Sequence, residues 1–385
     1  PGGSVRASLL KAPGTPPPSC PVLDGFPLAQ RGEARRALDM ALYASCIADF
    51  ISNLALILAT GYLAAFALSF GPPEFFTLIL FSLTIIAGVS GDSLAKGIVS
   101  ACCGLLLATV GLDIIFGTQR FTFGNFELMS GLNFIPVLIG LFALPEIFEH
   151  FLRPTDAPAP ATRLGRVGAS LKDLHDCLGT IIRGSFIGVV LGAIPGIGGA
   201  PAAFLSYGEA RRNSKNPESF GRGAIQGVAA AEAGNNGVAG ATMIPLLALG
   251  VPGDVTTAVI LGAFMIHGIQ PGPVMFSQNL PMIYSLFIGI MVSSVCLFVI
   301  GKLAIRTMSR IADVPNRILY PIVLVLCLFG SYAVNSAVFD ILVMIMMGAL
   351  GFVMLRLRIP AAPFLVAFVL GPMLEDSFRQ SLRLS

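Results

Sequence analysis

Charge is what this sequence most lacks. Asp, Glu, Lys and Arg make up 12% of its 385 residues, whereas hydrophobic residues make up 55% and the mean hydropathy is +0.83. Soluble domains usually carry about 25% charged residues. The composition therefore excludes a soluble globular protein and predicts a membrane protein. The net charge of +3 sits in clusters between apolar runs, which does not suit a nucleic-acid surface.

Residues that bind metals or perform catalysis are also scarce. The three histidines are too scattered to predict a metal site, and no paired-carboxylate or Ser/His/Asp arrangement is present. We therefore expect neither an enzyme nor a cofactor. The seven cysteines form no CxxC pair and lie mostly in apolar segments, so we expect buried free thiols. They are Cys20, Cys46, Cys102, Cys103, Cys177, Cys296 and Cys327.

Apolar runs poor in charge are abundant. A helix that crosses the ~30 Å hydrocarbon layer needs about 20 apolar residues, and such runs recur from residue 40 to residue 374. Residues 178–208 are too many for one straight helix and contain AIPGIGGAP, whereas residues 254–268 are few for a full span. We predict an all-α polytopic membrane protein with broken or re-entrant helical hairpins, because irregular backbone at membrane depth persists only where protein buries it or where it lines a cavity.

Basic residues gather in four segments between the apolar runs. The positive-inside rule assigns all four to the cytoplasm; they are residues 30–36, 153–173, 209–222 and 302–317. The Pro- and Ala-rich part of the second segment cannot form a helix, which indicates a linker. We predict a first repeat at residues 1–152, a cytoplasmic linker at 153–176 and a second repeat at 177–385.

Weak internal similarity supports this division. Three segments of the first half have counterparts roughly 240 positions later. They are APGTP at 12–16 with VPGDV at 251–255, 71–80 with 313–324, and 93–107 with 337–351. Where one half has a basic loop, the equivalent loop of the other half is uncharged. The positive-inside rule therefore places equivalent loops on opposite sides of the membrane. That pattern predicts two inverted-topology repeats.

Residues 223–301 contain only two formal charges, Glu232 and Asp254. Polar groups this rare inside a membrane are usually functional. The simpler alternative is that Glu232 pairs with a neighbouring helix and that the asparagines beside it cap helix ends.

Glycine and proline predict two helix breaks beside these charges. The residues concerned are Gly234, Gly237, Gly240, Gly250, Pro252 and Gly253. A helix N-terminus suits a carboxylate, whereas unwound carbonyls suit Na⁺. Asn235 and Asn236 can bind either ligand without the desolvation cost of a full charge. We place a possible Na⁺ site near Asn235, Asn236 and Gly250.

The segment AIPGIGGAPAAFLSYGEA, residues 193–210, has two interpretations. Gly196, Gly198 and Ala202 follow an apolar run as in a loose dinucleotide-binding fingerprint, but strands and helices do not alternate around them. A helix break lined with backbone amides suits the membrane-like flanks better.

The order of these motifs resembles the large membrane subunit of the tripartite tricarboxylate transporters, the TctA family. The resemblance covers essentially the whole chain and rests on GAIPGIGGAPAAFLSYGEARRNSK, FGRGAIQGVAAAEAGNNGVAGATMIPLLALGVPG and HGIQPGP, with GGSVRASLLKAPGTPPPSC and FGPPEFFTLILFSLTIIAG earlier. It implies a multi-pass symporter of the bacterial inner (cytoplasmic) membrane that imports small carboxylates such as tricarboxylates with Na⁺ or H⁺. It also implies a periplasmic solute-binding protein and a small membrane subunit as partners. A membrane-embedded enzyme or a channel-like pore is the alternative.

The resemblance further implies a substrate site built from the Pro-Gly motifs and the glycine-rich segments. Its residues are Gly2, Gly3, Ser4, Pro13, Gly14, Thr15, Gly196, Gly198, Gly199, Asn235, Asn236, Gly237, Pro252 and Gly253. Lys11, Pro17 and Pro18 depart from the residues expected there, which predicts an atypical substrate preference. We also expect family segments before Pro1 and after Ser385, because the family pattern starts earlier and extends further.

Overall fold

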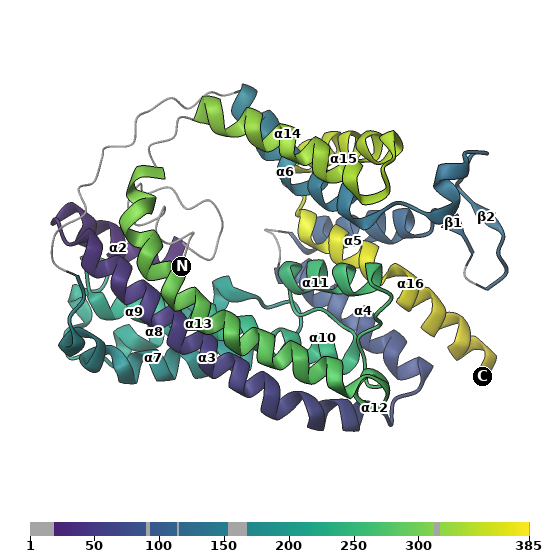
Figure 1. Cartoon of the computed structure of the whole chain (residues 1–385). Coiled ribbons are helices and arrows are strands. Elements are labelled where there is room, and N and C mark those ends of the chain that lie inside the picture. Colours follow the sequence, from purple (N-terminus) through teal and green to yellow (C-terminus); the bar gives the residue numbers. More distant parts are fainter. Residues whose placement is uncertain (1–18, 90–92, 114, 153–167, 312–315, 385) are drawn as a thin grey trace. The chain divides into compact units, whose positions relative to one another are not determined.

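Helices account for most of the structure. The computed structural model describes residues 19–89, 93–113, 115–152, 168–311 and 316–384 (Figure 1). Among these residues, seven helices are long and apolar enough to cross a membrane: Ala34–Ala67, Pro72–Val89, Phe134–Leu152, Leu171–Gly192, Leu280–Ile305, Val338–Arg356 and Ala361–Leu384. The prediction of a helical, multi-pass membrane protein is confirmed. The chain divides into two compact units, and each is described by itself.

The first unit contains the described residues of 1–67, 157–253 and 271–313. Its helices are α2 (Ser19–Gln30), α3 (Ala34–Ala67), α7 (Leu171–Gly192), α8 (Gly199–Arg212), the 3₁₀ turn η2 (Pro217–Ser219), α9 (Ile225–Ala241), α10 (Met243–Leu249), α12 (Met275–Gln278) and α13 (Leu280–Ile311). Four helices, α2, α3, α7 and α8, pack around α9. Alanine and glycine make up most of α9, and every residue from Gly227 to Gly234 is buried. Small side chains let neighbouring helices approach α9 closely.

A row of glycines brings α7 against α9. Gly184, Gly188 and Gly192 recur every four residues, so they share one face of α7. A Cβ atom on Gly188 would lie 2.5 Å from the carbonyl oxygen of Gly234, and a Cβ on Gly192 would lie 2.9 Å from the Cα of Val238. The backbones of the two helices therefore touch, and no larger residue fits between them.

The first of the two predicted helix breaks is wrong, because α9 continues through GNNG to Ala241. Gly234 instead admits the carbonyl of Ala202 on α8, which lies 2.5 Å from where its Cβ would be, and Gly240 admits the backbone of α3. A glycine in a helix interior costs about 1 kcal/mol relative to alanine, and close packing on several sides of α9 outweighs that cost. The apolar run divides later, at Thr242, between α9 and α10.

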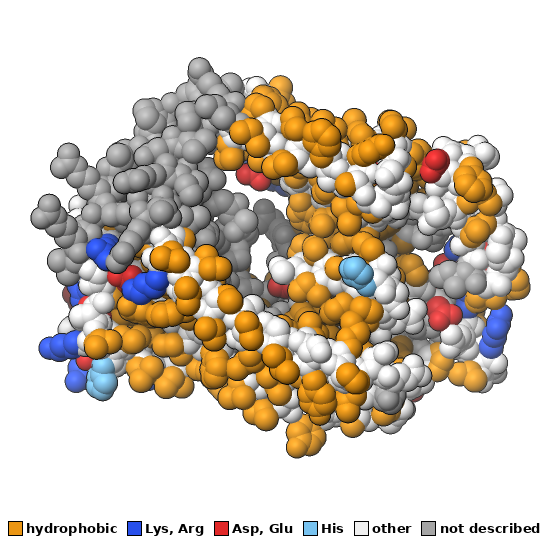
Figure 2. Space-filling model, viewed as in Figure 1, with side chains coloured by type: hydrophobic (Ala, Val, Ile, Leu, Met, Phe, Trp, Pro, Cys, Tyr) orange, Lys and Arg blue, Asp and Glu red, His pale blue; other side chains and the backbone are white. Residues whose placement is uncertain are grey.

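Helices α3 and α13 pack together, and at 34 and 32 residues each is longer than a membrane span requires. At 1.5 Å per residue, the 34 residues of α3 span about 51 Å, longer than the ~30 Å hydrocarbon layer. Near one end, Lys302 Nζ donates to Asp39 Oδ1 (2.8 Å) and to the hydroxyl of Tyr43 (2.7 Å). Many exposed side chains of both helices are hydrophobic, and orange side chains gather in this part of the molecule (Figure 2). The basic segment 302–317, predicted as a loop, is helical as far as Ile311.

The second unit contains the described residues of 68–156, 254–270 and 314–385. Its elements are α4 (Pro72–Val89), α5 (Leu94–Ala108), β1 (Gly111–Leu112), β2 (Gln119–Arg120), the 3₁₀ turn η1 (Phe126–Ser130), α6 (Phe134–Leu152), α11 (Val255–Ile266), α14 (Asn316–Asn335), α15 (Val338–Arg356) and α16 (Ala361–Leu384). α16 packs against α4 and α5, and α6 packs against α15. Gly351 of α15 lies against the backbone of Leu141 on α6, so close glycine packing recurs in this unit.

A short β-hairpin between α5 and α6 departs from the all-α prediction. β1 and β2 pair antiparallel, Gly111 opposite Arg120. Ion pairs tie the hairpin to α16: Arg120 to Glu375 (2.8 Å) and Arg379 to Asp113 (2.7 Å). Hydrogen bonds from the Arg379 guanidinium hold the pKa of Asp113 well below its usual range.

The cysteines are only partly where we expected them. Cys20 and Cys177 are buried, and Cys46 and Cys327 are half-buried. The expectation is wrong for three others, Cys102, Cys103 and Cys296, which are exposed. A free thiol behaves as a small hydrophobic group, so apolar surroundings in the sequence fit an outward-facing position on a membrane helix as well as a core position.

The predicted repeats remain a prediction. Each compact unit takes segments from both residues 1–152 and residues 177–385, and the segment 12–16 lies outside the described residues. Inverted topology, re-entrant hairpins and the sidedness of the basic segments likewise remain predictions.

A buried carboxylate joins α2 to the start of α9. Asp24 Oδ1 accepts hydrogen bonds from the backbone amides of Gly221, Gly223 and Ala224, each at 2.8 Å. Its Oδ2 accepts from the hydroxyl of Tyr207 at 2.8 Å. Negative charge is favourable at a helix N-terminus, so Asp24 acts as the N-terminal anion of α9.

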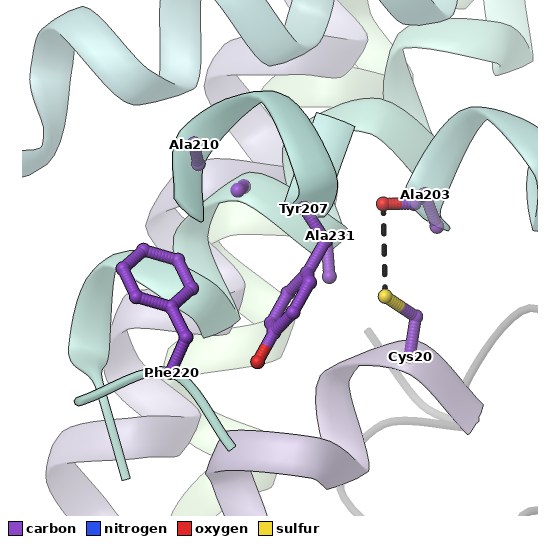
Figure 3. Packing of buried hydrophobic residues seen from close by; sticks show 7 residues of the cluster. Cys20, Ala203, Tyr207, Ala210, Phe220 and Ala231 are labelled. Carbon is purple, nitrogen blue, oxygen red and sulfur yellow. Dashed lines mark hydrogen bonds between the residues drawn. The ribbon is translucent and has the colours of Figure 1, made fainter. Parts of the chain in front are cut away.

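Apolar packing surrounds this carboxylate. The ring of Tyr207 meets that of Phe220 edge-on, with 5.4 Å between centroids, and Ala231 of α9 lies in the same cluster (Figure 3). Cys20 Sγ donates to the carbonyl of Ala203 at 3.6 Å (Figure 3). The cluster holds α2, α8 and α9 together.

Replacing Asp24 with Ala should destabilise the first unit by on the order of 3 kcal/mol, because three backbone amides lose their buried acceptor. The measurement is the midpoint of thermal unfolding in detergent, followed with a thiol-reactive dye. Asp176→Ala is the matched control, since its side chain is 57% exposed and exposed pairs contribute little. Equal midpoints for the two variants would show that Asp24 does not anchor α9.

Candidate functional site

Six of the predicted site residues, Gly2, Gly3, Ser4, Pro13, Gly14 and Thr15, lie outside the described residues. The other eight belong to the first unit. Their positions decide which parts of the predicted site can be assembled from the described chain.

The helix break predicted at AIPGIGGAP is confirmed. α7 ends at Gly192, and α8 begins at Gly199. Between them Gly196 and Gly198 have φ of +92° and +70°, which L side chains rarely adopt. A connection of only a few residues can therefore turn sharply here, which leaves the start of α8 next to the end of α7.

The second predicted break, at Gly250 to Gly253, is also confirmed. Gly250 ends α10 in the left-handed conformation, with φ of +72°. Its amide donates to the carbonyl of Leu246 (2.9 Å), and the amide of Val251 donates to that of Pro245 (3.3 Å). The bond from Gly250 to Leu246, with Gly250 in the left-handed conformation, is the αL motif that closes many helices. Pro252 and Gly253 then continue as non-helical backbone.

The two breaks meet. The amide of Gly196 donates to the carbonyl of Gly253 at 2.6 Å, although 57 positions separate them in the sequence. Gly253 also packs against Thr242, at the end of α9, where a Cβ would lie 2.9 Å from the Thr242 Cβ. Irregular backbone from two distant segments thus lies side by side: residues 251–253 are buried, whereas residues 193–198 are half-buried or exposed.

Asn235 lies over the start of α8. Its Oδ1 occupies the space where a Cβ of Gly199 would be, so a larger residue at position 199 would displace the Asn235 side chain. Gly198 provides no side-chain cap for α8. The first amides of a helix have no intrahelical partners, so the N-terminus of α8 presents donors beside the Asn235 amide.

Asn236 belongs to a different group. Its Nδ2 donates to Ser45 Oγ on α3 (2.9 Å), to Glu232 Oε2 (3.1 Å) and to the carbonyl of Glu232 (3.0 Å). Consecutive residues of a helix point about 100° apart, so the neighbouring asparagines face α8 and α3. The predicted site is therefore divided into a backbone part around Asn235 and a carboxylate part around Asn236.

Gly237 joins neither part. It packs against α7, where a Cβ would lie 2.7 Å from the carbonyl oxygen of Ser185. Its own carbonyl accepts from Ser52 Oγ (2.6 Å), and the same hydroxyl accepts from the amide of Ala241 (2.9 Å). In a regular α-helix the amide of Ala241 donates to the carbonyl of Gly237. The Ser52 hydroxyl bonds to both of these groups, so it inserts into the last turn of α9.

Asp254, the second rare charge, has a local partner. Its Oδ1 accepts from the amide of Thr257 at 2.8 Å, and Thr257 Oγ1 accepts from the amide of Asp254 at 2.8 Å. This reciprocal capping box satisfies the N-terminus of α11 with a carboxylate of the chain itself. Asp254 is thus accounted for as the N-cap of α11.

Sequence reasoning missed the polar face of α3. Ser45, Asp49, Ser52 and Asn53 are spaced as one helical stripe in an apolar run, and that spacing is the signal that could have found them. Asn53 Nδ2 donates to Ser294 Oγ on α13 (2.8 Å) and to Asp49 Oδ2 (3.2 Å). α3 therefore presents polar groups to both α9 and α13.

The second unit has a cavity of ≈ 1130 Å³ that contains none of the predicted site residues. Arg120 is the basic residue in its lining, and Glu375 already accepts from both Nη atoms of that guanidinium. The cavity therefore does not supply an unpaired positive charge for a carboxylate. The helix breaks of the first unit remain the better candidate for a carboxylate site.

Comparison with known proteins agrees with the motifs. A family model described as the tripartite tricarboxylate transporter TctA family matches residues 1–366. The chain is 37% identical over 384 residues to an uncharacterized 52.8 kDa protein in the TAR-I ttuC' 3' region of Agrobacterium vitis, covering 100% of this chain and 76% of that protein. An uncharacterized protein in the TAR-II ttuC' 3' region of the same organism is 36% identical over 198 residues, 51% of this chain and 82% of that protein. No solved structure matches the chain.

Proposed function

Because this chain belongs to the tripartite tricarboxylate transporter TctA family, we propose that this transporter component imports small carboxylates such as tricarboxylates by cation-coupled symport. It would act in the bacterial inner membrane and receive substrate from a periplasmic solute-binding protein, together with a small membrane subunit. The observation that carries the proposal is the meeting of the two glycine breaks, Gly196 with Gly253.

These breaks suit a carboxylate for electrostatic reasons. A helix N-terminus carries roughly half a positive charge and unpaired N–H groups. The start of α8 has no side-chain cap and lies beside the amide of Asn235. The N-termini of α9 and α11, in contrast, already hold the carboxylates of Asp24 and Asp254. We therefore assign a substrate carboxylate to Gly198, Gly199 and Asn235.

Transport requires that this site bind and release substrate. Backbone amides and a neutral Asn side chain attract a carboxylate without the strong binding of a buried Arg, so exit remains possible. Gly196, Pro252 and Gly253 support the site by holding the two irregular segments together. Na⁺ near Asn235, Asn236 and Gly250, and H⁺, are the two candidate coupling ions.

The test is uptake of radiolabelled citrate, and of smaller carboxylates, into proteoliposomes that contain the membrane subunits. The solute-binding protein is added outside, and an inward Na⁺ or H⁺ gradient is imposed or omitted. We expect accumulation above equilibrium that needs both the gradient and the binding protein. Uptake that is equally fast without any gradient would contradict symport.

The same assay separates the alternatives. A channel-like pore would let citrate equilibrate but not accumulate, and a membrane-embedded enzyme would convert it into a new compound. Chromatography of the labelled contents after uptake distinguishes these outcomes. Recovery of unmodified citrate above its external concentration supports a transporter.

Replacing Asn236 with Ala should reduce gradient-driven uptake at least about tenfold, since hydrogen bonds to charged groups contribute about 1.5–3 kcal/mol and Glu232 loses a donor. Cys103→Ala, on an exposed position of α5, is the control and should stay near wild type. Initial uptake rates, corrected for the amount of reconstituted protein, provide the measurement. Equal rates for the two variants would remove Asn236 from the site.

A further inference from the structure

Glu232 is a fully buried carboxyl group at the centre of the first unit. Its exposed fraction is 0%. Oε2 accepts from Ser45 Oγ at 2.8 Å and from Asn236 Nδ2 at 3.1 Å, whereas Oε1 has no hydrogen-bond partner among the described residues. Both partners of Glu232 are uncharged.

An ionised carboxylate in such surroundings is expensive. Removing its charge from water without a cationic partner costs several kcal/mol even after relaxation, and two neutral donors offset only part of that cost. The carboxyl group therefore needs a proton or a metal cation whenever the helices close around it. Intramembrane carboxyl groups of this kind often form proton relays.

The surrounding atoms favour a proton over a metal ion. Hard cations require several oxygen ligands, but the hydroxyl of Ser45 donates to Glu232 and accepts from Asn236. The Nδ2 of Asn236 is surrounded by three acceptor oxygens, which sets the orientation of its amide. Both neighbours thus direct hydrogen atoms towards the carboxylate, and Oε1 is left for one further proton.

Other titratable groups lie on the helices packed against α9, and each has hydrogen-bond partners or hydrophobic neighbours of its own. On α2, Asp24 is held by backbone amides, and Tyr207 of α8 donates to it. Cys20 of α2 donates to a backbone carbonyl, and Cys177 of α7 lies in a hydrophobic cluster. Asp49 of α3, one turn from Ser45, accepts from Asn53 and Ser294.

The charged groups nearer the helix ends have partners as well. Arg183 of α7 pairs with Glu209 of α8 at 2.9 Å, and Arg36 of α3 pairs with Asp173 of α7. Lys302 of α13 pairs with Asp39 of α3 at 2.8 Å. Glu209 Oε2 is also buried without a hydrogen-bond partner, but Glu209 is paired with Arg183. Among the described residues, Glu232 is therefore the buried carboxyl group that has both a vacant oxygen and no cationic partner.

We propose that Glu232 carries the coupling proton, bound at Oε1 and supported through Oε2 by Ser45 and Asn236. The inference rests on the proposed symport. One proton from the entry side forms an O–H bond at Oε1, and the neutral carboxyl group allows the occluded state. The same proton leaves to the opposite side with substrate, and the carboxylate is restored.

The test compares Glu232→Gln with the wild type in proteoliposomes that contain the membrane subunits, with the solute-binding protein outside. Gln resembles the protonated carboxyl group but cannot release a proton. We expect accumulation of citrate driven by an inward proton gradient to fall at least about tenfold, to the level seen without a gradient. Counterflow, the exchange of external label for unlabelled citrate inside, should stay within about twofold of wild type. Glu146→Gln, an exposed position on α6, is the matched control.

Ser45→Ala provides a second measurement, the pH dependence of uptake. This dependence would not change if the contact between Ser45 and Glu232 were purely structural. Loss of a donor to the ionised form favours protonation, so the pH of half-maximal gradient-driven uptake should rise by about one unit. An unchanged pH profile would contradict the proposal.

Three further results would overturn the proton assignment alone. Gradient-driven accumulation that persists in Glu232→Gln would remove Glu232 from coupling while leaving the proposed function intact. Glu232 would also be excluded from coupling if Asp49→Asn, rather than Glu232→Gln, abolished accumulation but preserved counterflow. Accumulation by the wild type that follows a Na⁺ gradient alone would exclude it as well. If the wild type transports neither citrate nor the smaller carboxylates, the proposed function and the proton assignment are both wrong.

Discussion

Gly188→Val should prevent the protein from reaching its folded state. A Cβ at this position would lie 2.5 Å from the carbonyl oxygen of Gly234 and 2.8 Å from the Cα of Gly237. Both are backbone atoms of α9, so no side-chain rotation can relieve the overlap, and α7 would have to separate from α9. We expect a loss of about 4 kcal/mol or more, the range of severe core substitutions.

Gly179→Val is the matched control on the same helix. A Cβ there would meet only the end of the Arg183 side chain, at 3.9 Å. Because both changes replace glycine by a β-branched residue within α7, the difference in helix propensity cancels. The measurement is the amount of monodisperse protein extracted from membranes, followed by its thermal unfolding midpoint. Similar yields of the two variants would mean that α7 and α9 are not in close contact.

Asn235→Asp should weaken carboxylate binding by about 100-fold, which corresponds to about 2.7 kcal/mol. An Asp at this position places a negative charge where Oδ1 now approaches Gly199, and that charge would occupy the amides at the start of α8. It would also repel the substrate carboxylate. The defect should grow as the pH rises through the titration of the new carboxyl group, since only the ionised form repels.

Binding of citrate by the reconstituted membrane subunits, measured by scintillation proximity over a range of pH, checks this expectation. Asn216→Asp makes the same chemical change at an exposed position before η2 and should leave binding unchanged. Thermal unfolding of both variants shows whether the fold is retained. Binding by Asn235→Asp within threefold of wild type at high pH would place the substrate away from α8.

The two confirmed breaks were predictable because their cause is local. Gly196, Gly198 and Gly250 adopt positive φ, which other residues rarely tolerate. Pro252 cannot donate a helical hydrogen bond. Such effects act within a few residues, so the sequence predicts where α7 and α10 end without reference to the rest of the fold.

The GNNG motif shows where that reasoning stops. Glycine can break a helix or admit a neighbouring backbone, and nothing within a few residues distinguishes these roles. Gly234 and Gly240 lie in a continuous helix because α8 and α3 approach them there. Long-range contacts therefore decided the outcome against the local preference.

The sequence by itself determined the class of protein, the family and the helix ends at Gly192 and Gly250. The shortage of charge, the order of motifs and backbone stereochemistry act without knowledge of distant neighbours. Only the tertiary structure decided which groups the asparagines reach, because adjacent side chains on α9 point about 100° apart towards different helices. It brought Asn235 to Gly199, and Asn236 to Ser45 and Glu232. The sequence thus predicted one site where the first unit contains two groups of polar contacts.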